Sequence, residues 1–347
     1  MQTRIQSLVI GLLVIGGMSV GGCHSPQVEE PQPQINQYSL EQTECVIAQA
    51  KEHLETIQTL PIRDLFPDDF QDAQNALVHS EECLDGNAFD AAYQAAQESQ
   101  QASQRILRKF YQQIIVQSAA RTKADIQEIA KDDPDNPLQD FIPELNDILD
   151  YADGLEDEQQ LVDLEKVKHD FDAVRQVEHN AKENVKRTLE MDVSFAPGKY
   201  GLSEQGEQIL QEYSHKILVS KSMFDALYPD DPVVITIKVI GYADPVRFRE
   251  GTTLLQRLAE GVEDEVPHTE PARRKFFNQR LSEFRARVIA EYTAALLVQQ
   301  GAGQSRFQVK QEIFGLGETL PPGVEPPYPV QDPRRRFCKI YSYITTP

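Results

Sequence analysis

The chain has 347 residues, with 34 Lys and Arg against 55 Asp and Glu, and a net charge of −21. Residues 1–190 hold 15 basic and 35 acidic side chains, whereas residues 191–347 hold 19 and 20, so nearly all the excess charge lies in the first half. We therefore expect two domains of different character. An acidic half of this kind repels phosphate backbones, which argues against nucleic-acid binding.

The amino terminus predicts an export signal. Arg4 precedes an uncharged run over 8–20, which is shorter than the roughly 20 residues that a membrane-spanning helix needs. The run ends in Ser-Val-Gly-Gly before Cys23, which resembles the lipobox of bacterial lipoproteins. The resemblance implies a signal peptide over 1–22, acylation of Cys23 with palmitate, and, with His24 next, sorting to the outer membrane. The alternative is an ordinary cleavage site with a chance cysteine.

Residues 23–37 are predicted to be the lipidated cysteine and a proline-rich tether to the membrane. The stretch after Cys23, HSPQVEEPQPQINQ, contains three prolines and almost no apolar side chains. In extended form, at about 3.1 Å per residue, it reaches roughly 40 Å. The mature protein is thus expected to be a lipid-anchored body that faces the periplasm.

Residues 38–190 are predicted to form an acidic helical domain, either a bundle or an array of hairpins. Apolar and alanine side chains recur every three or four residues, the spacing of an amphipathic helix. The predicted helices cover 39–60, a segment from about 67 to the turn at 85–87, a long segment from 88 to a break at 132–137, then 138–152 and 155–190. Nothing in this half resembles a catalytic site, and an envelope protein is a candidate partner for it.

Three cysteines remain after Cys23. Cys45 and Cys83 lie on neighbouring predicted helices, and the periplasm permits a disulfide between them. Cys45 points away from the apolar stripe of its helix, so the bridge would clamp the flanks of the hairpin, and the pairing stays open. The spacing offers no metal site.

Residues 191–347 change to alternating strands and helices. Strands are predicted at 192–195, 233–240, 306–314 and 337–344, with helices after Ser203 and around 277–295. This order predicts a mixed sheet with helices on one face, of βαβαββ type, and an α+β protein overall.

The motifs of this half resemble the OmpA-like peptidoglycan-binding domain. The matching residues are Phe195, Gly241-Tyr242-Ala243-Asp244, the helix Asn278-Gln279-Arg280-Leu281-Ser282-Glu283-Phe284-Arg285-Ala286, Gly315-Leu316-Gly317-Glu318 with Pro321, and Arg334-Arg335-Arg336. The resemblance covers just under half of the chain. It implies a peptidoglycan site that includes Asp244, Asn278, Arg285, Tyr242 and Arg336.

The residues themselves favour the same site. Asp244 follows a buried strand, and Asn278 and Arg285 are seven apart, so they point nearly the same way on a helix. A carboxylate beside a guanidinium can hold a zwitterion, with the ammonium on Asp244 and the carboxylate on Arg285. Diaminopimelate in a peptidoglycan stem peptide ends in such a group, and the resemblance implies that it is the ligand. The alternative is a structural ion pair between Asp244 and Arg285.

The sequence departs from the family pattern beside this site. Ala243 and Pro245 flank the aspartate, and residues of about 246–272 are inserted before the helix. The insertion carries Arg247 and Arg249, and it would gate the site, contact glycan or occlude it.

We expect a non-enzymatic outer-membrane lipoprotein that binds peptidoglycan and needs no cofactor. The alternative is an envelope scaffold whose helical domain binds a protein partner and whose OmpA-like domain is degenerate. An enzyme is only a distant third alternative, because the sequence shows no set of nucleophile, base or metal ligands in an order that would form a catalytic site.

Overall fold

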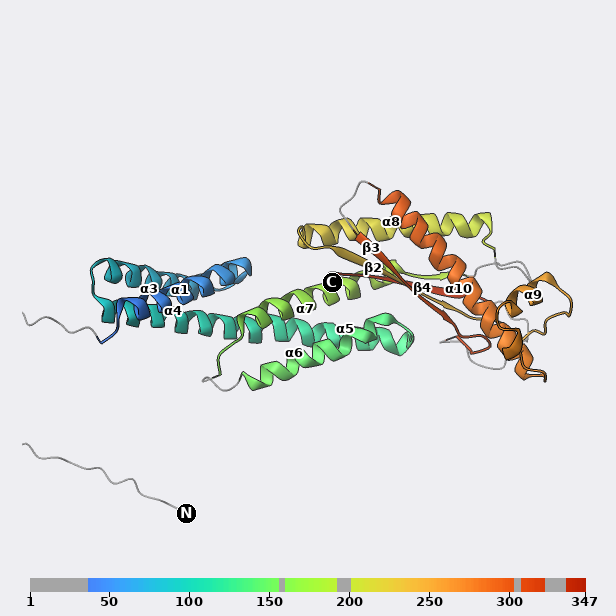
Figure 1. Ribbon diagram of the computed structural model, residues 1–347, viewed down its shortest axis with the longest axis horizontal. Coiled ribbons are helices and arrows are strands. Elements are labelled where there is room, and N and C mark those ends of the chain that lie inside the picture. The colour runs from blue at the N-terminus through green and yellow to red at the C-terminus, as the bar shows by residue number, and fades with distance from the viewer. Residues whose placement is uncertain (1–36, 156–159, 192–200, 303–306, 322–334) are drawn as a thin grey trace, which may run out of the picture.

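The computed structural model describes residues 37–155, 160–191, 201–302, 307–321 and 335–347. Figure 1 shows an elongated molecule with a helical arm at one end and a four-stranded sheet with its helices at the other. This arrangement confirms the predicted α+β class. Among the described helices, none is both long and apolar enough to cross a membrane.

The arm begins with α1 (Leu40–Thr59). Ser39 caps this helix: its side chain accepts a hydrogen bond from the Gln42 backbone, and the Gln42 side chain accepts one from Ser39 in return. The remaining elements of the arm, in order, are α2 (Ile62–Leu65), α3 (Pro67–Asp85), α4 (Phe89–Phe110), η1 (Tyr111–Val116), α5 (Gln117–Asp132), η2 (Pro137–Phe141), α6 (Ile142–Gly154) and α7 (Leu164–Arg187).

Small side chains hold α3 and α4 together. Ala92 and Ala96 are fully buried on α4, which lets the two helices approach closely. Ser80 on α3 donates to the Ala92 carbonyl at 2.9 Å, and Ser99 on α4 donates to the Ala73 carbonyl at 2.8 Å. The alanines that recur along α4 therefore allow close packing against α3.

One continuous helical run forms the backbone of the arm. It passes from α4 through the π-helical turn η1 into α5, from residue 89 to residue 132. At about 1.5 Å per residue, these 44 residues span about 65 Å. In the turn, Tyr111 is fully buried and donates to Asp170 on α7 at 2.5 Å. The predicted break at 132–137 is confirmed.

The predicted helix over 155–190 is wrong at both ends. The helix α7 starts at Leu164, because the Asp163 side chain accepts from the Lys166 backbone and caps it there. It stops at Arg187, because the next four residues form the strand β1 (Thr188–Met191), which pairs with the last strand of the sheet. The sheet therefore begins before the predicted boundary at 191.

The sheet has the order β1-β4-β2-β3. Its other strands are β2 (Val233–Gly241), β3 (Phe307–Gly315) and β4 (Cys338–Thr345), and the helices beside it are α8 (Glu204–Leu227), α9 (Thr253–Ala259), η3 (Glu263–Glu265) and α10 (Ala272–Gln300). The strands β2 and β3 are parallel, and β4 runs antiparallel to β1 and β2. The predicted strand at 192–195, with Phe195, lies outside the described residues.

The two faces of the sheet have different partners. Val233, Ile235, Ile237 and Val239 alternate along β2 and share one core with α8 and α10, as predicted. The residues between them point to the other face, where Lys238 donates to the Asp135 carbonyl at 3.3 Å. Asp135 belongs to the turn between α5 and η2, so the arm contacts the sheet on the face opposite to α8 and α10.

Candidate functional site

The candidate site lies where β2 and β3 end side by side. Gly241 and Gly315 are neighbours in the parallel ladder, and α10 crosses directly over them. A Cβ at Gly241 would lie 2.2 Å from the Ser282 carbonyl oxygen, and one at Gly315 would lie 2.5 Å from the Glu283 nitrogen. Glycine is required at both positions because helix backbone occupies the space of a side chain.

The two loops that leave these strands are joined to each other and to α10. Ala243 donates its N–H to the Gly317 carbonyl at 2.7 Å, and Gly317 donates to the Ser282 hydroxyl at 2.9 Å. Gly317 has φ +55°, which favours glycine. These bonds fix the backbone directly before Asp244, and thereby fix where its carboxylate lies.

Asp244, Arg285 and Arg336 meet at this point. Asp244 is 8% exposed and Arg285 is 4% exposed. The Arg336 Nε lies 3.7 Å from an Asp244 carboxylate oxygen. Burial raises the pKa of Asp244, although the nearby guanidinium groups, Arg336 foremost, oppose the rise. Burial lowers the pKa of Arg285, against the charge of Asp244. Both charges are thus held where water solvates them poorly.

Asn278 is also at the site, in a positioning role. Its side-chain amide donates to the Val246 carbonyl at 3.3 Å and to Glu318 at 2.8 Å. Glu318 in turn receives two bonds from Arg274, at 2.7 and 2.9 Å. Burial alone would raise the pKa of Glu318, but the bonds from Arg274 and Asn278 outweigh it and lower that pKa. Asn278 therefore ties α10 to the loops after β2 and β3.

The insertion forms a wall of the site. Figure 1 shows α9 beside the N-terminal half of α10. Leu255 and Leu258 of α9 pack on Phe277 and Leu281 of α10. Between the insertion and α10 lies a cavity of about 510 Å³, lined by Asp244, Val246, Arg247, Phe248, Arg249, Thr252, Leu254, Asn278, Leu281, Arg285 and Arg336. The insertion thus encloses the site rather than filling it.

Four of the five predicted binding residues line this cavity, and Tyr242 does not. Tyr242 is 1% exposed, and its ring stacks on Phe337 with the centroids 5.0 Å apart. Its hydroxyl donates to the Asp135 carboxylate of the arm at 2.7 Å, and burial raises its pKa. We correct its role: Tyr242 lies on the same face of the sheet as Lys238, towards the arm, and the chain has left the strand before it reaches Asp244.

The cavity also contains residues that were not among the predicted binding residues. They are Phe248, Thr252, Leu254 and Leu281. Leu281 belongs to the helix motif and to the apolar stripe of α10, so the sequence carried a usable signal for it. The other three lie in the insertion, where no periodic pattern pointed to them.

The possible Cys45–Cys83 disulfide, which the sequence left open, is not formed in the structure. Cys45, Cys83 and Cys338 are all free thiols. Cys45 is exposed on α1, whereas Cys83 lies near the His79 ring on its own helix, with Sγ 3.7 Å from Nε2. Cys338 is buried in the sheet, and burial raises its pKa to about 12. Cys23 lies outside the described residues.

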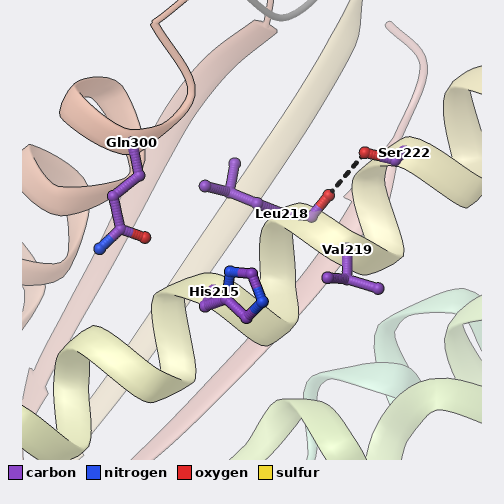
Figure 2. Close-up of a pocket in the computed structure, with 5 residues that line it drawn as sticks. All are labelled: His215, Leu218, Val219, Ser222 and Gln300. Carbon is purple, nitrogen blue, oxygen red and sulfur yellow. Dashed lines mark hydrogen bonds between the residues drawn. The ribbon is translucent and has the colours of Figure 1, made fainter.

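A second hollow of about 470 Å³ lies on the outer surface between α8 and α10 (Figure 2). His215, Leu218, Val219 and Ser222 line it from α8, and Gln300 faces them from α10. The Ser222 hydroxyl is already bonded to the Leu218 carbonyl at 3.0 Å. No acid and base face each other among these five side chains, so the cavity beside the insertion is the better candidate.

Comparisons with known proteins give a weak structural neighbour. No family model matches the chain. No curated protein matches it either. A similar solved structure is the OmpA-like domain of FopA1 from Francisella tularensis subsp. tularensis SCHU S4, at 20% identity and a TM-score of 0.23, over 46% of this chain and 73% of that one. The proposals that follow rest on the residues of this chain.

Proposed function

We propose that the protein binds peptidoglycan non-covalently and catalyses no reaction. The ligand is the zwitterionic end of diaminopimelate in a stem peptide, with its ammonium on Asp244 and its carboxylate on Arg285 and Arg336. The observation that carries this proposal is a buried carboxylate beside two guanidinium groups, all three lining one cavity of about 510 Å³. Such a group of charges suits a ligand that carries both signs.

The raised pKa of Asp244 supports a cationic ligand group. Burial outweighs the nearby guanidinium groups, so the free carboxylate is poorly solvated. An ammonium in contact with the carboxylate would offset this loss of solvation.

The test compares binding with stability in the same proteins. Asp244→Asn keeps the shape but removes the negative charge, and Arg285→Lys keeps the charge but loses the planar fork. Each variant should bind isolated sacculi at least about tenfold more weakly in co-sedimentation, because truncating a desolvated charge pair costs about 2–5 kcal/mol.

The melting temperature separates this proposal from the structural alternative. If the residues serve binding, both variants should lose more in binding to sacculi than in stability. Variants that melt lower yet sediment with sacculi as well as the wild type would show a structural ion pair and overturn the proposal.

We further propose that acylated Cys23 anchors the protein in the outer membrane, so that it joins that membrane to the cell wall. The sequence before Cys23 supports the anchor. Labelled palmitate should enter the wild type and not a Cys23→Ser variant. Label in the variant would contradict this assignment.

A further inference from the structure

The cavity beside the insertion is strongly biased in charge. Its ionisable lining side chains are one acid, Asp244, and four bases, Arg247, Arg249, Arg285 and Arg336. A single amino-acid zwitterion adds one ammonium and one carboxylate, so it would leave this excess of positive charge unchanged. The arrangement therefore fits a ligand with more than one carboxylate.

Arg247 and Arg249 are held at the cavity by the residue between them. Phe248 packs inward, with its ring centroid 5.7 Å from that of Phe277 on α10. The two arginines on either side are exposed and line the cavity. Because the half-buried ring anchors the segment, both guanidinium groups are kept on the same side of it.

The backbone of this segment is also fixed. The Val246 carbonyl accepts from Asn278 at 3.3 Å, and the Arg249 carbonyl accepts from the Thr252 hydroxyl at 3.0 Å. Thr252 additionally caps α9 through the Leu255 N–H at 3.3 Å. The arginines thus project from a loop whose backbone is held by hydrogen bonds.

Two acidic side chains near this segment, Glu250 and Glu318, are already bonded to other bases. Glu250, which follows Arg249, pairs with Arg273 at 2.6 and 3.2 Å. Glu318 pairs with Arg274. Among the described residues, no ion pair joins a carboxylate to Arg247 or Arg249, so these two charges can face an incoming anion.

We propose that Arg247 and Arg249 bind a second carboxylate of the ligand, so that the cavity favours stem peptides that carry this carboxylate in addition to the one of the zwitterionic end. The inference rests on the proposed function and assigns to the insertion a role in specificity. In the tripeptide L-Ala-γ-D-Glu-diaminopimelate, two groups can supply that carboxylate: the α-carboxylate of glutamate and the terminal carboxylate of diaminopimelate.

The experiment measures dissociation constants by titration calorimetry for three forms of this tripeptide. One form is unmodified, one is amidated at the glutamate carboxylate, and one is amidated at the terminal carboxylate. The proteins are the wild type, the Arg247→Gln/Arg249→Gln double variant, and Arg257→Gln as a control. Arg257 belongs to the same insertion and is exposed, but it does not line the cavity.

The double variant should bind the unmodified tripeptide about tenfold more weakly than the wild type, since a bond to a charged group contributes about 1.5–3 kcal/mol. Amidating one of the two carboxylates should weaken binding by the wild type by a similar factor, and it should leave the double variant unchanged. The amidated tripeptide that the wild type binds more weakly identifies the carboxylate that Arg247 and Arg249 contact. Arg257→Gln should behave as the wild type.

Two results would overturn the inference and leave the proposed function intact. One is that the wild type binds all three forms with equal affinity. The other is that the double variant binds the unmodified form as tightly as the wild type does. No binding of the unmodified tripeptide by the wild type would overturn the proposed function and this inference together.

Discussion

At the scale of single residues, Glu318 shows how the site is held in shape. It closes the loop after β3 onto α10 through bonds from Arg274 and Asn278, and its side chain is 12% exposed. These bonds lower its pKa despite burial. A carboxylate with a lowered folded pKa adds stability above its unfolded pKa of about 4.3, and this stability is lost as the pH falls through the folded value.

We therefore expect Glu318→Gln to be less stable than the wild type at pH 7, by about 1–2 kcal/mol in urea unfolding. The difference should shrink as the pH is lowered below about 4. Glu283→Gln is the matched control, because Glu283 pairs with Arg287 on the surface, where an ion pair contributes about 0–1 kcal/mol. A gap between wild type and Glu318→Gln that is the same at pH 7 and pH 3.5 would contradict this account.

At the scale of elements, α7 completes the sheet where β1 is too short. The strand β1 pairs with β4 over Cys338 to Tyr341 only. Beyond it, the Asn180 side chain donates to the Ile344 carbonyl at 2.7 Å and accepts from the Ile344 N–H at 2.9 Å. One turn earlier, Gln176 accepts from the Thr346 N–H at 3.1 Å. Two side-chain amides thus replace the missing strand.

Asn180→Ala should destabilise the protein by about 2–4 kcal/mol, because it leaves a buried N–H and a buried carbonyl of Ile344 without their partner. Urea unfolding measures the loss, and faster amide exchange at Ile344 locates it. Lys182→Ala on the same helix removes only an exposed charge and should change stability by about 0.5 kcal/mol or less. Equal stability of the two variants would show that α7 does not support β4.

The sequence predicted the elements well where apolar spacing was regular. The helices α1, α3 and α10 and the strands β2, β3 and β4 fall close to their predicted ranges. It failed at α7 and β1, because Thr188 to Met191 becomes a strand only by pairing with β4, which lies about 150 residues later in the chain. Local pattern cannot report such a pairing.

The site also contains residues that local sequence patterns predicted and one that they did not. Asp244, Asn278 and Arg285 were predictable, since a strand end and a helix face placed them together. Tyr242 was misassigned, because its partner Asp135 lies in the arm, more than 100 residues away. That contact depends on how the two halves pack, and no motif encodes it.

At the scale of the whole molecule, the long helical run connects the start of the chain to the sheet. At its beginning, the Asp90 side chain accepts from the backbone N–H groups of Gln37 and Tyr38, at 2.7 and 3.0 Å. At its end, Asp133 binds the Lys339 ammonium and the Tyr341 hydroxyl of β4, both at 2.8 Å. Within our proposal, the arm is a spacer of about 65 Å between the membrane tether and the wall-binding domain.

The contact between arm and sheet is a cluster of polar groups. Asp133 and Asp135 bond Lys339, Tyr341 and Tyr242 on the face of the sheet away from α8 and α10. Buried charges of this kind fix one geometry, because any other arrangement leaves them without partners. The domain that carries the site is thus held in a defined orientation to the arm.

The central claim is that the cavity at Asp244 and Arg285 recognises the zwitterionic end of diaminopimelate. The most direct measurement compares two stem peptides that differ only in having diaminopimelate or lysine at the third position. Lysine keeps the ammonium but lacks the carboxylate that Arg285 and Arg336 would bind. We expect calorimetry on the full-length protein to give at least about tenfold tighter binding of the diaminopimelate peptide. Equal dissociation constants for the two peptides would contradict the claim.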